Sequence, residues 1–426
     1  MILTNARILT FDDHNRVFDS GTVEVRADGS IGRVRSGRAR GADTVDAGGR
    51  LLMPALINCH SHLYSTLARG ITLPGAEPAD FPEILKRLWW RLDRALRLED
   101  VYYSALIGLI DSAKNGVGTV IDHHSSPNAC ARSLDVIERA YRKVGLRGAT
   151  CYETSDRDGK AAAAAAIAEN VRFLERRRRN DTVGAAFGLH AAFTLSDGTL
   201  RACVEANQSL GGAFHIHVSE DRCDRGAVSR LSRLGILNGR TLAAHAIHVT
   251  AAERRVLARS GVNVVHNPQS NCNNAVGTAA LVELFRDGVT VGLGSDGYSP
   301  RLWEEFKTAL HLQKMRARDP RVGYAEAYAA AFQNNRAIVR KIWGVEVGRI
   351  APGAKADLAL FDYFPPTPME PGNLFGHLLF GIANAPVDSL MVNGRWVLRD
   401  KQCVNVDERR VAEKASRRAR ALWERF

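Results

Sequence analysis

The chain has 426 residues, of which 45% are hydrophobic and 24% are charged, so its composition is that of an ordinary globular protein. No run approaches the ~18 consecutive apolar residues of a membrane span, which excludes a membrane-spanning protein. The net charge of +12 suggests a nucleic-acid partner, but the arginines are dispersed, and the densest run, at positions 176 to 179, follows a helix-forming stretch where a solvated helix end explains it better.

The first 50 residues are predicted to form short strands at positions 2–10, 21–25 and 32–34. Apolar and polar residues alternate in these runs, and Asp-Gly or Asn-Ala turns separate them, as in a small β-sandwich. Arg7 and nearby turn residues interrupt the beginning of the chain, so it lacks the basic-then-apolar layout of a signal peptide. We therefore expect a cytoplasmic protein.

The apolar run at positions 53 to 57 is predicted to be a buried strand that leads to His60 and His62. Side chains alternate between the two faces of a strand, so these imidazoles point the same way and can share one cation. Three later apolar runs also end in ligand-type residues, at positions 213–220, 241–245 and 289–296. A site built from the ends of several strands is what a (β/α)8 barrel offers.

Between residues 54 and 346, apolar β-type runs alternate with helical patterns, as a parallel barrel requires. The eight expected strands end near Asn58, Asp122, Tyr152, Leu189, His217, Ala244, Val265 and Leu293. Helices are expected at 100–115, 133–144, 161–177, 199–210 and 251–260. Trp89 and Trp90 have helical spacing, which favours packing over a base-stacking platform.

Two segments near the end of the chain, 348–361 and 387–398, are predicted to be strands, with a hairpin turn at 392–395. Terminal β segments that flank an α/β middle are most simply joined into one discontinuous domain. We therefore predict an α/β fold: a β-sandwich part at 1–53, a TIM-type (β/α)8 barrel at 54–346, and a second β-sandwich part with a C-terminal helix at 347–426. Seven cysteines, unpaired in sequence, are expected to be reduced and buried, as for Cys59 and Cys151.

The order of the motifs His-x-His, His-x-x-Glu, His and Ser-Asp-Gly resembles the amidohydrolase superfamily, in its cytosine deaminase and triazine hydrolase-like branch. Within that branch the chain is most similar to SsnA-type aminohydrolases. The residues that carry the resemblance are 56–65, Arg69-Gly70, 88–93, 122–128, 187–190, 217–221 and 265–271. The chain departs from the pattern at Ala55, where the superfamily usually has glycine, and in a short segment between Glu220 and His245.

The resemblance implies a metal-dependent hydrolase with one divalent ion, Zn2+ in first place and Fe2+ or Mn2+ as alternatives. Its ligands would be His60, His62, His217 and Asp296. One ion is expected because His190 stands where binuclear members of the superfamily carry a bridging lysine.

The resemblance also implies how protons move. Glu220 is expected to protonate a ring nitrogen of the substrate, His245 to orient or deprotonate the attacking water, and Asp296 to pass a proton to the leaving amine. A role of His245 as a metal ligand is the competing interpretation.

Further site residues are expected to contact the substrate or to brace the site. Arg69 and His190 are candidates for substrate binding, and His266 and Asn267 for bracing. The remaining histidines considered, His123, His124, His215 and His248, are expected to be structural.

The predicted function is hydrolytic deamination of a nitrogen heterocycle, such as a purine, pyrimidine or triazine-like ring, by metal-activated hydroxide. Hydrolytic dechlorination or dealkylamination, or the opening of a cyclic amide or imine, uses the same site and stays an alternative. A nucleic-acid-binding protein is a remote alternative, because no basic strip with interleaved aromatics is present. The expected partners are a small heterocyclic substrate and further copies of the chain, as a dimer or larger homo-oligomer, with no nucleic acid and no membrane.

Overall fold

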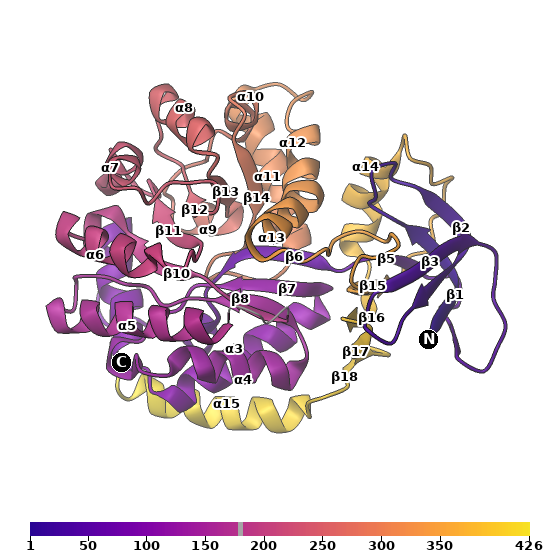
Figure 1. Cartoon of the computed structure of the whole chain (residues 1–426), viewed down its shortest axis with the longest axis horizontal. Helices are drawn as coiled ribbons and strands as arrows, with labels where there is room; N and C mark the ends of the chain where they lie inside the picture. Colours follow the sequence, from indigo (N-terminus) through magenta and orange to yellow (C-terminus); the bar gives the residue numbers. More distant parts are fainter. Residues whose placement is uncertain (178–181) are drawn as a thin grey trace.

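The computed structural model describes residues 1–177 and 182–426, and two positions of the arginine run, 178 and 179, lie outside that part. Figure 1 shows a barrel of strands surrounded by helices, with a β-rich domain at one side that contains both indigo and yellow strands. Among the helices described, none is long and apolar enough to cross a bilayer.

The barrel consists of parallel strands in two hydrogen-bonded groups that follow one another in chain order. The first group is β6 (Leu56–Ser61), β7 (Val117–Asp122), β8 (Arg147–Thr150) and β9 (Val183–Ala185). The second is β10 (Phe187–Ala191), β11 (Phe214–Val218), β12 (Leu242–His245), β13 (Asn263–His266) and β14 (Thr290–Leu293).

Only Ala186 separates β9 from β10, so together they occupy the place of one strand. At the other junction Ser61 bridges to Asp296, and the N–H groups of Ser295 and Asp296 donate to the His60 carbonyl. These contacts bring β6 beside β14. The strands therefore have the order of a (β/α)8 barrel, as predicted.

Helices cover the outside of the barrel (Figure 1). The five predicted helices begin and end within two residues of their expected positions: α3 (Leu98–Lys114), α4 (Ser133–Val144), α5 (Lys160–Arg177), α6 (Asp197–Gln208) and α8 (Ala251–Ser260). Further α-helices are α7 (Ala227–Arg233), α9 (Pro268–Asn273), α10 (Leu281–Arg286), α11 (Leu302–Ala317), α12 (Tyr324–Tyr328), α13 (Asn335–Trp343) and α15 (Glu408–Trp423). Short α1 (Phe81–Ile84), α2 (Trp90–Ala95) and α14 (Leu374–Gly376) lie in connections.

Local sequence explains the boundaries of α8. Thr250 accepts a hydrogen bond from the Glu253 N–H, and the Glu253 carboxylate accepts from the Thr250 N–H, which is a capping box. The helix ends at Gly261, whose φ of 63° is left-handed and therefore favours glycine.

The β-rich domain unites both ends of the chain in one mixed sheet of nine strands. Its strands are β1 (Ile2–Leu9), β2 (Val17–Val25), β3 (Ile31–Ser36), β4 (Thr44–Asp46), β5 (Leu51–Pro54), β15 (Leu358–Phe361), β16 (Val387–Val392), β17 (Arg395–Arg399) and β18 (Gln402–Cys403). The two halves meet where β5 pairs with β1 on one side and with β15 on the other. The expected discontinuous domain is present, but this pairing joins its strands into a single sheet.

Two sequence-based expectations need correction, one for the segment before β15 and one for the cysteines. Residues 348–357 form turns and not a strand, because Pro352 and Gly353 make the chain bend there before β15 begins. The cysteines are all unpaired thiols, and Cys59 and Cys151 are buried as predicted, but Cys223 and Cys272 are exposed.

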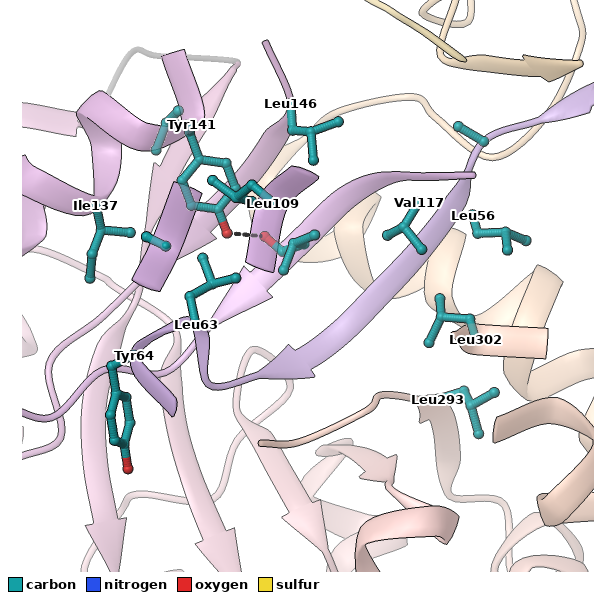
Figure 2. Packing of buried hydrophobic residues seen from close by; sticks show 14 of the residues in the cluster. Leu56, Leu63, Tyr64, Leu109, Val117, Ile137, Tyr141, Leu146, Leu293 and Leu302 are labelled. Carbon is teal, nitrogen blue, oxygen red and sulfur yellow. Dashed lines mark hydrogen bonds between the residues drawn. The ribbon is translucent and has the colours of Figure 1, made fainter. Parts of the chain in front are cut away.

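Apolar side chains pack between the strands and the helices of the barrel. Figure 2 shows Leu109, Ile137 and Tyr141 around β7, where the Tyr141 hydroxyl donates to the Val120 carbonyl over 2.8 Å. A buried ion pair joins the barrel to the β-rich domain, since Arg147 Nε lies 2.7 Å from Asp357 Oδ2 and both side chains are 2% exposed. The small domain is therefore fixed to the end of the barrel opposite the site described next.

Candidate active site

The carboxyl ends of three barrel strands, β6, β11 and β14, deliver the four predicted metal ligands to one place. His62 Nε2 lies 3.1 Å from His217 Nε2 and 3.0 Å from Asp296 Oδ1, and His60 Nε2 lies 3.4 Å from the same Asp296 oxygen. The backbone turns sharply here, since His245 and Asp296 have left-handed φ values of 75° and 55°. Non-glycine residues seldom adopt this conformation, and such strain is typical of functional sites.

Backbone carbonyls fix the orientation of two imidazole rings. His62 Nδ1 donates to the His123 carbonyl and His217 Nδ1 donates to the His190 carbonyl, each over 2.7 Å. In a neutral ring the other nitrogen is then a bare acceptor. The two Nε2 atoms, 3.1 Å apart, therefore direct lone pairs at each other, which requires a cation between or beside them.

The residues present fit a divalent metal ion. Around a tetrahedral zinc ion with ~2.0–2.1 Å bonds to nitrogen, neighbouring ligand atoms lie about 3.3 Å apart. The measured separations of 3.0–3.4 Å match this value. The ligand atoms of His60, His217, His245 and Asp296 also lie within 4.8 Å of one another.

The electrostatics of the cluster favour one positive charge. Burial would lower the pKa of His62, but the hydrogen bond and the charge of Asp296 outweigh it and raise this pKa to about 9. Burial lowers the pKa of His60 to about 4. Without a metal ion the cluster therefore favours one positive charge, a proton on His62, and a metal ion can take the place of that proton.

Glu220 and His245 lie next to each other beside the cluster. His245 Nδ1 donates to the side-chain oxygen of Asn271 over 2.9 Å, so its Nε2 is an acceptor, which lies 3.4 Å from Glu220 Oε2. Burial, together with the charge of Asp296, raises the pKa of Glu220 well above its ordinary value. Burial therefore favours the protonated form of Glu220, which lies next to an acceptor nitrogen of His245.

Ser270 was not predicted from the sequence, although it lies in the stretch 265–271 that carries the family resemblance. Its hydroxyl donates to Asp296 Oδ2 over 2.5 Å, which fixes the orientation of the carboxylate whose Oδ1 atom lies beside His60 and His62. Ser270 and Asn271 contact Asp296 and His245 directly, whereas the bracing role of His266 and Asn267 stays a prediction. His266 is buried with no hydrogen bond to either ring nitrogen within the described chain, and Asn267 donates to a backbone carbonyl.

A cavity opens onto these groups at the carboxyl ends of the strands. One side carries the polar groups of the cluster, and the other side is apolar. The apolar lining is Phe81, Leu85, Trp89, Trp90, Phe193 and Tyr298. Both tryptophans pack against buried apolar residues, as predicted, and the π-helical segment Leu85–Trp89 and the first turn of α2 also bring them to the cavity.

A charged wall of the cavity was also missed. Arg157 forms an ion pair with Asp93, donates to the Ser125 hydroxyl over 2.7 Å, and lies over the ring of Trp90. Burial raises the pKa of Asp93 to about 6 and that of Glu153, beside it, to about 7.

Four buried atoms of this wall have no hydrogen-bond partner among the described residues: Asp93 Oδ1, Glu153 Oε1, Arg157 Nε and Trp90 Nε1. A buried polar group without a hydrogen bond lowers the stability of the fold, so this wall is suited to a ligand that both donates and accepts hydrogen bonds. Asp93 lies in the family-like stretch, but nothing local indicated its partner, which is 64 residues away.

The two expected substrate contacts differ in their placement. His190 lines the cavity, and its Nδ1 lies 2.8 Å from the Thr194 hydroxyl. Arg69 does not line it, because its guanidinium turns outward to an ion pair with Asp111 at 2.8 Å and stays 67% exposed. A substrate-binding role of Arg69 is therefore not supported.

Comparisons with known proteins agree with this geometry. The sequence profile of the Amidohydrolase family matches residues 51–397, which confirms the predicted family. The chain is 31% identical over 402 residues to a 5-methylthioadenosine/S-adenosylhomocysteine deaminase of Desulforudis audaxviator, covering 90% of this chain and 89% of the relative. It is 30% identical over 438 residues to a 5'-deoxyadenosine deaminase of Methanosarcina mazei, covering 99% and 98%. A crystal structure of an adenosine deaminase from Xanthomonas campestris with bound zinc superposes with a TM-score of 0.86 at 24% identity, covering 100% of this chain and 98% of that one.

Proposed function

Since this chain belongs to the amidohydrolase family, we propose that it is a metal-dependent deaminase that hydrolyses the exocyclic amino group of an adenine nucleoside. The observation that carries the proposal is the position of Glu220, a carboxyl group whose pKa burial raises, next to the acceptor nitrogen of His245 at a cluster of ligand atoms. This arrangement suits addition of water to a ring carbon with proton delivery to the adjacent ring nitrogen.

The proposed ligands are His60, His62, His217 and Asp296, and a divalent ion bound to them would lower the pKa of a water molecule to around neutrality. Zinc suits three imidazoles and a carboxylate, with Fe2+ or Mn2+ as alternatives.

The chain's own residues account for proton transfer. Glu220 gives its proton to a ring nitrogen of the base, which makes the neighbouring carbon electrophilic. His245 takes a proton from the attacking water. Asp296 Oδ2, which accepts from Ser270 and lies 3.8 Å from His245 Nε2, is placed to take the hydroxyl proton of the adduct and pass it to the departing amine. The proton that His245 took from the water can then restore Glu220, whose Oε2 lies 3.4 Å from His245 Nε2.

The cavity supports a nucleoside in particular. Aromatic side chains such as Trp90 and Phe193 offer flat apolar surface for a base, and His190 lies beside the ligand cluster where a ring nitrogen would be. Asp93, Glu153 and Arg157 line the same cavity, and their polar groups suit the hydroxyl groups of a sugar. The relatives named for 5-methylthioadenosine, S-adenosylhomocysteine and 5'-deoxyadenosine favour an adenosine with a modified 5'-position.

The test is a comparison of ammonia release from adenosine, 5'-deoxyadenosine, 5-methylthioadenosine and S-adenosylhomocysteine, alongside pterins, triazines and cyclic amidines. We expect turnover with at least one adenine nucleoside at a kcat/KM well above that for the other heterocycles. Release of ammonia only from a triazine, pterin or cyclic amidine would contradict the nucleoside assignment. Homo-oligomerisation and a cytoplasmic location stay predictions.

A further inference from the structure

A chain of buried side chains lies behind the ligand cluster, on the side away from the cavity. His60 Nδ1 lies 2.8 Å from His215 Nε2, and His215 Nδ1 lies 3.8 Å from the Cys151 sulfur. That sulfur lies 3.7 Å from the Asp122 carbonyl oxygen. His60, His215 and Cys151 have no exposed surface, and none of them lines the cavity.

The hydrogen positions in this chain follow from one requirement. If His60 presents the lone pair of Nε2 to a metal ion, its proton is on Nδ1 and is donated to His215. His215 Nε2 must then be an acceptor, so the His215 proton is on Nδ1 and is directed at the Cys151 sulfur. The Cys151 thiol in turn donates to the Asp122 carbonyl. Every donor in the chain has one acceptor.

His60 differs in this respect from the other two histidine ligands. His62 and His217 donate to backbone carbonyls, which can only accept. The acceptor for the His60 proton is the side chain of His215, a ring that can carry its own proton on either nitrogen. A histidine with the opposite tautomer at position 215 would donate to His60 and force the His60 proton onto the nitrogen that must bind the metal.

We propose that His215, oriented by Cys151, is a positioning residue that holds His60 in its metal-binding tautomer. The inference rests on the ligand set of the proposed function and not on the identity of the substrate.

The same residues could instead form a second metal site with His123, since the ligand atoms of His123, Cys151 and His215 lie within 4.8 Å of one another. Two observations favour the hydrogen-bond chain. The rings of His123 and His215 are stacked, with centroids 4.4 Å apart and planes at 19°, so their in-plane lone pairs do not converge on one point. His215 Nε2 is also already engaged by His60.

The test compares His215→Gln with His215→Leu. The amide oxygen of glutamine can occupy the place of Nε2 and accept from His60, whereas leucine offers no acceptor. Zinc affinity is measured by competition with a chelator, and the visible spectrum of the cobalt-loaded protein reports the ligand geometry. We expect His215→Leu to lose about 10- to 100-fold in metal affinity and to change the cobalt spectrum, while His215→Gln stays close to wild type. Equal affinity of wild type and His215→Leu, or equal loss in both variants, would overturn the inference.

A second pair of variants covers the case in which His215→Leu does not fold. Cys151→Val removes the acceptor for His215, and Cys203→Val makes the same change at a buried thiol of α6 that does not line the cavity. We expect weaker zinc binding only for Cys151→Val, and wild-type affinity in both variants would contradict the proposal. A wild-type protein that binds no divalent metal would instead contradict the proposed function.

Discussion

The Nε2 atoms of His62 and His217 lie 3.1 Å apart although both rings donate their Nδ1 protons to backbone carbonyls. Two acceptor nitrogens at this distance repel unless a cation is shared between them. The raised pKa of His62 shows how the protein meets this requirement with a proton. A metal ion is a better shared cation than a proton, because it can also accept lone pairs from His60 and Asp296.

Removal of the Ser270 hydroxyl is expected to slow turnover without loss of metal. The hydroxyl donates to the Asp296 carboxylate, and a hydrogen bond to a charged group contributes about 1.5–3 kcal/mol. We therefore expect Ser270→Ala to lower kcat on the order of 10- to 100-fold, as measured by ammonia release at saturating substrate. Ser260→Ala is the matched control, because Ser260 donates to a helix carbonyl on α8. A kcat within twofold of wild type would contradict this role of Ser270.

Glu220→Gln is expected to keep the metal and lose most of the rate. Glutamine preserves the shape of the side chain but cannot transfer a proton, and such transfer contributes on the order of 10²- to 10⁴-fold. Elemental analysis and steady-state kinetics on the same preparation check both parts. Near-normal turnover, or loss of the metal, would show that Glu220 has another role.

The pH dependence of kcat/KM should be bell-shaped. Ionisation of the attacking water near neutrality gives the rising limb. Burial raises the pKa of Glu220, so its proton is still present well above the pH at which an ordinary glutamate loses it, and the rate falls only as pH rises through this higher pKa. The apparent values belong to the coupled site as a whole. Glu220→Gln should lack the falling limb, and an unchanged falling limb in that variant would contradict the assignment.

The ion pair between Arg147 and Asp357 should matter for stability and not for chemistry. Both side chains are 2% exposed, and loss of one partner leaves a buried charge, which costs about 3–5 kcal/mol. Asp357→Asn is thus expected to lower the unfolding free energy by about this amount in urea denaturation, with kcat unchanged below the transition. Arg321→Ala, which breaks an exposed pair with Asp319, should leave the urea midpoint unchanged. Equal stability of Asp357→Asn and wild type would show that the pair does not hold the two domains together.

The sequence was sufficient to predict residues whose placement follows from the strand itself. The two-residue period of β6 and of the residue that follows it puts His60 and His62 on one side, and the parallel order of the strands brings His217 and Asp296 to the same end. These geometric rules act over a few residues or through regular topology.

Residues on connections could not be placed in this way, because their direction depends on partners remote in sequence. Arg69 follows the metal-binding strand closely but turns to Asp111 on α3. Arg157 lies at the cavity through an ion pair with Asp93 and a contact with the ring of Trp90, and both of these partners lie on α2. Two tryptophans at helical spacing likewise gave no sign that a π-helical segment would bring them to the cavity.

The most direct test of the account is deamination in isotope-labelled water by the metal-loaded and the metal-free protein. With an adenine nucleoside turned over by the enzyme, we predict ammonia in equal amount to a product that carries one oxygen from the solvent. We predict this activity with about one equivalent of divalent metal per chain, its loss on chelation and its return with zinc. Unchanged turnover by the metal-free protein, two metal ions per chain at full activity, or a product without solvent oxygen would contradict the account.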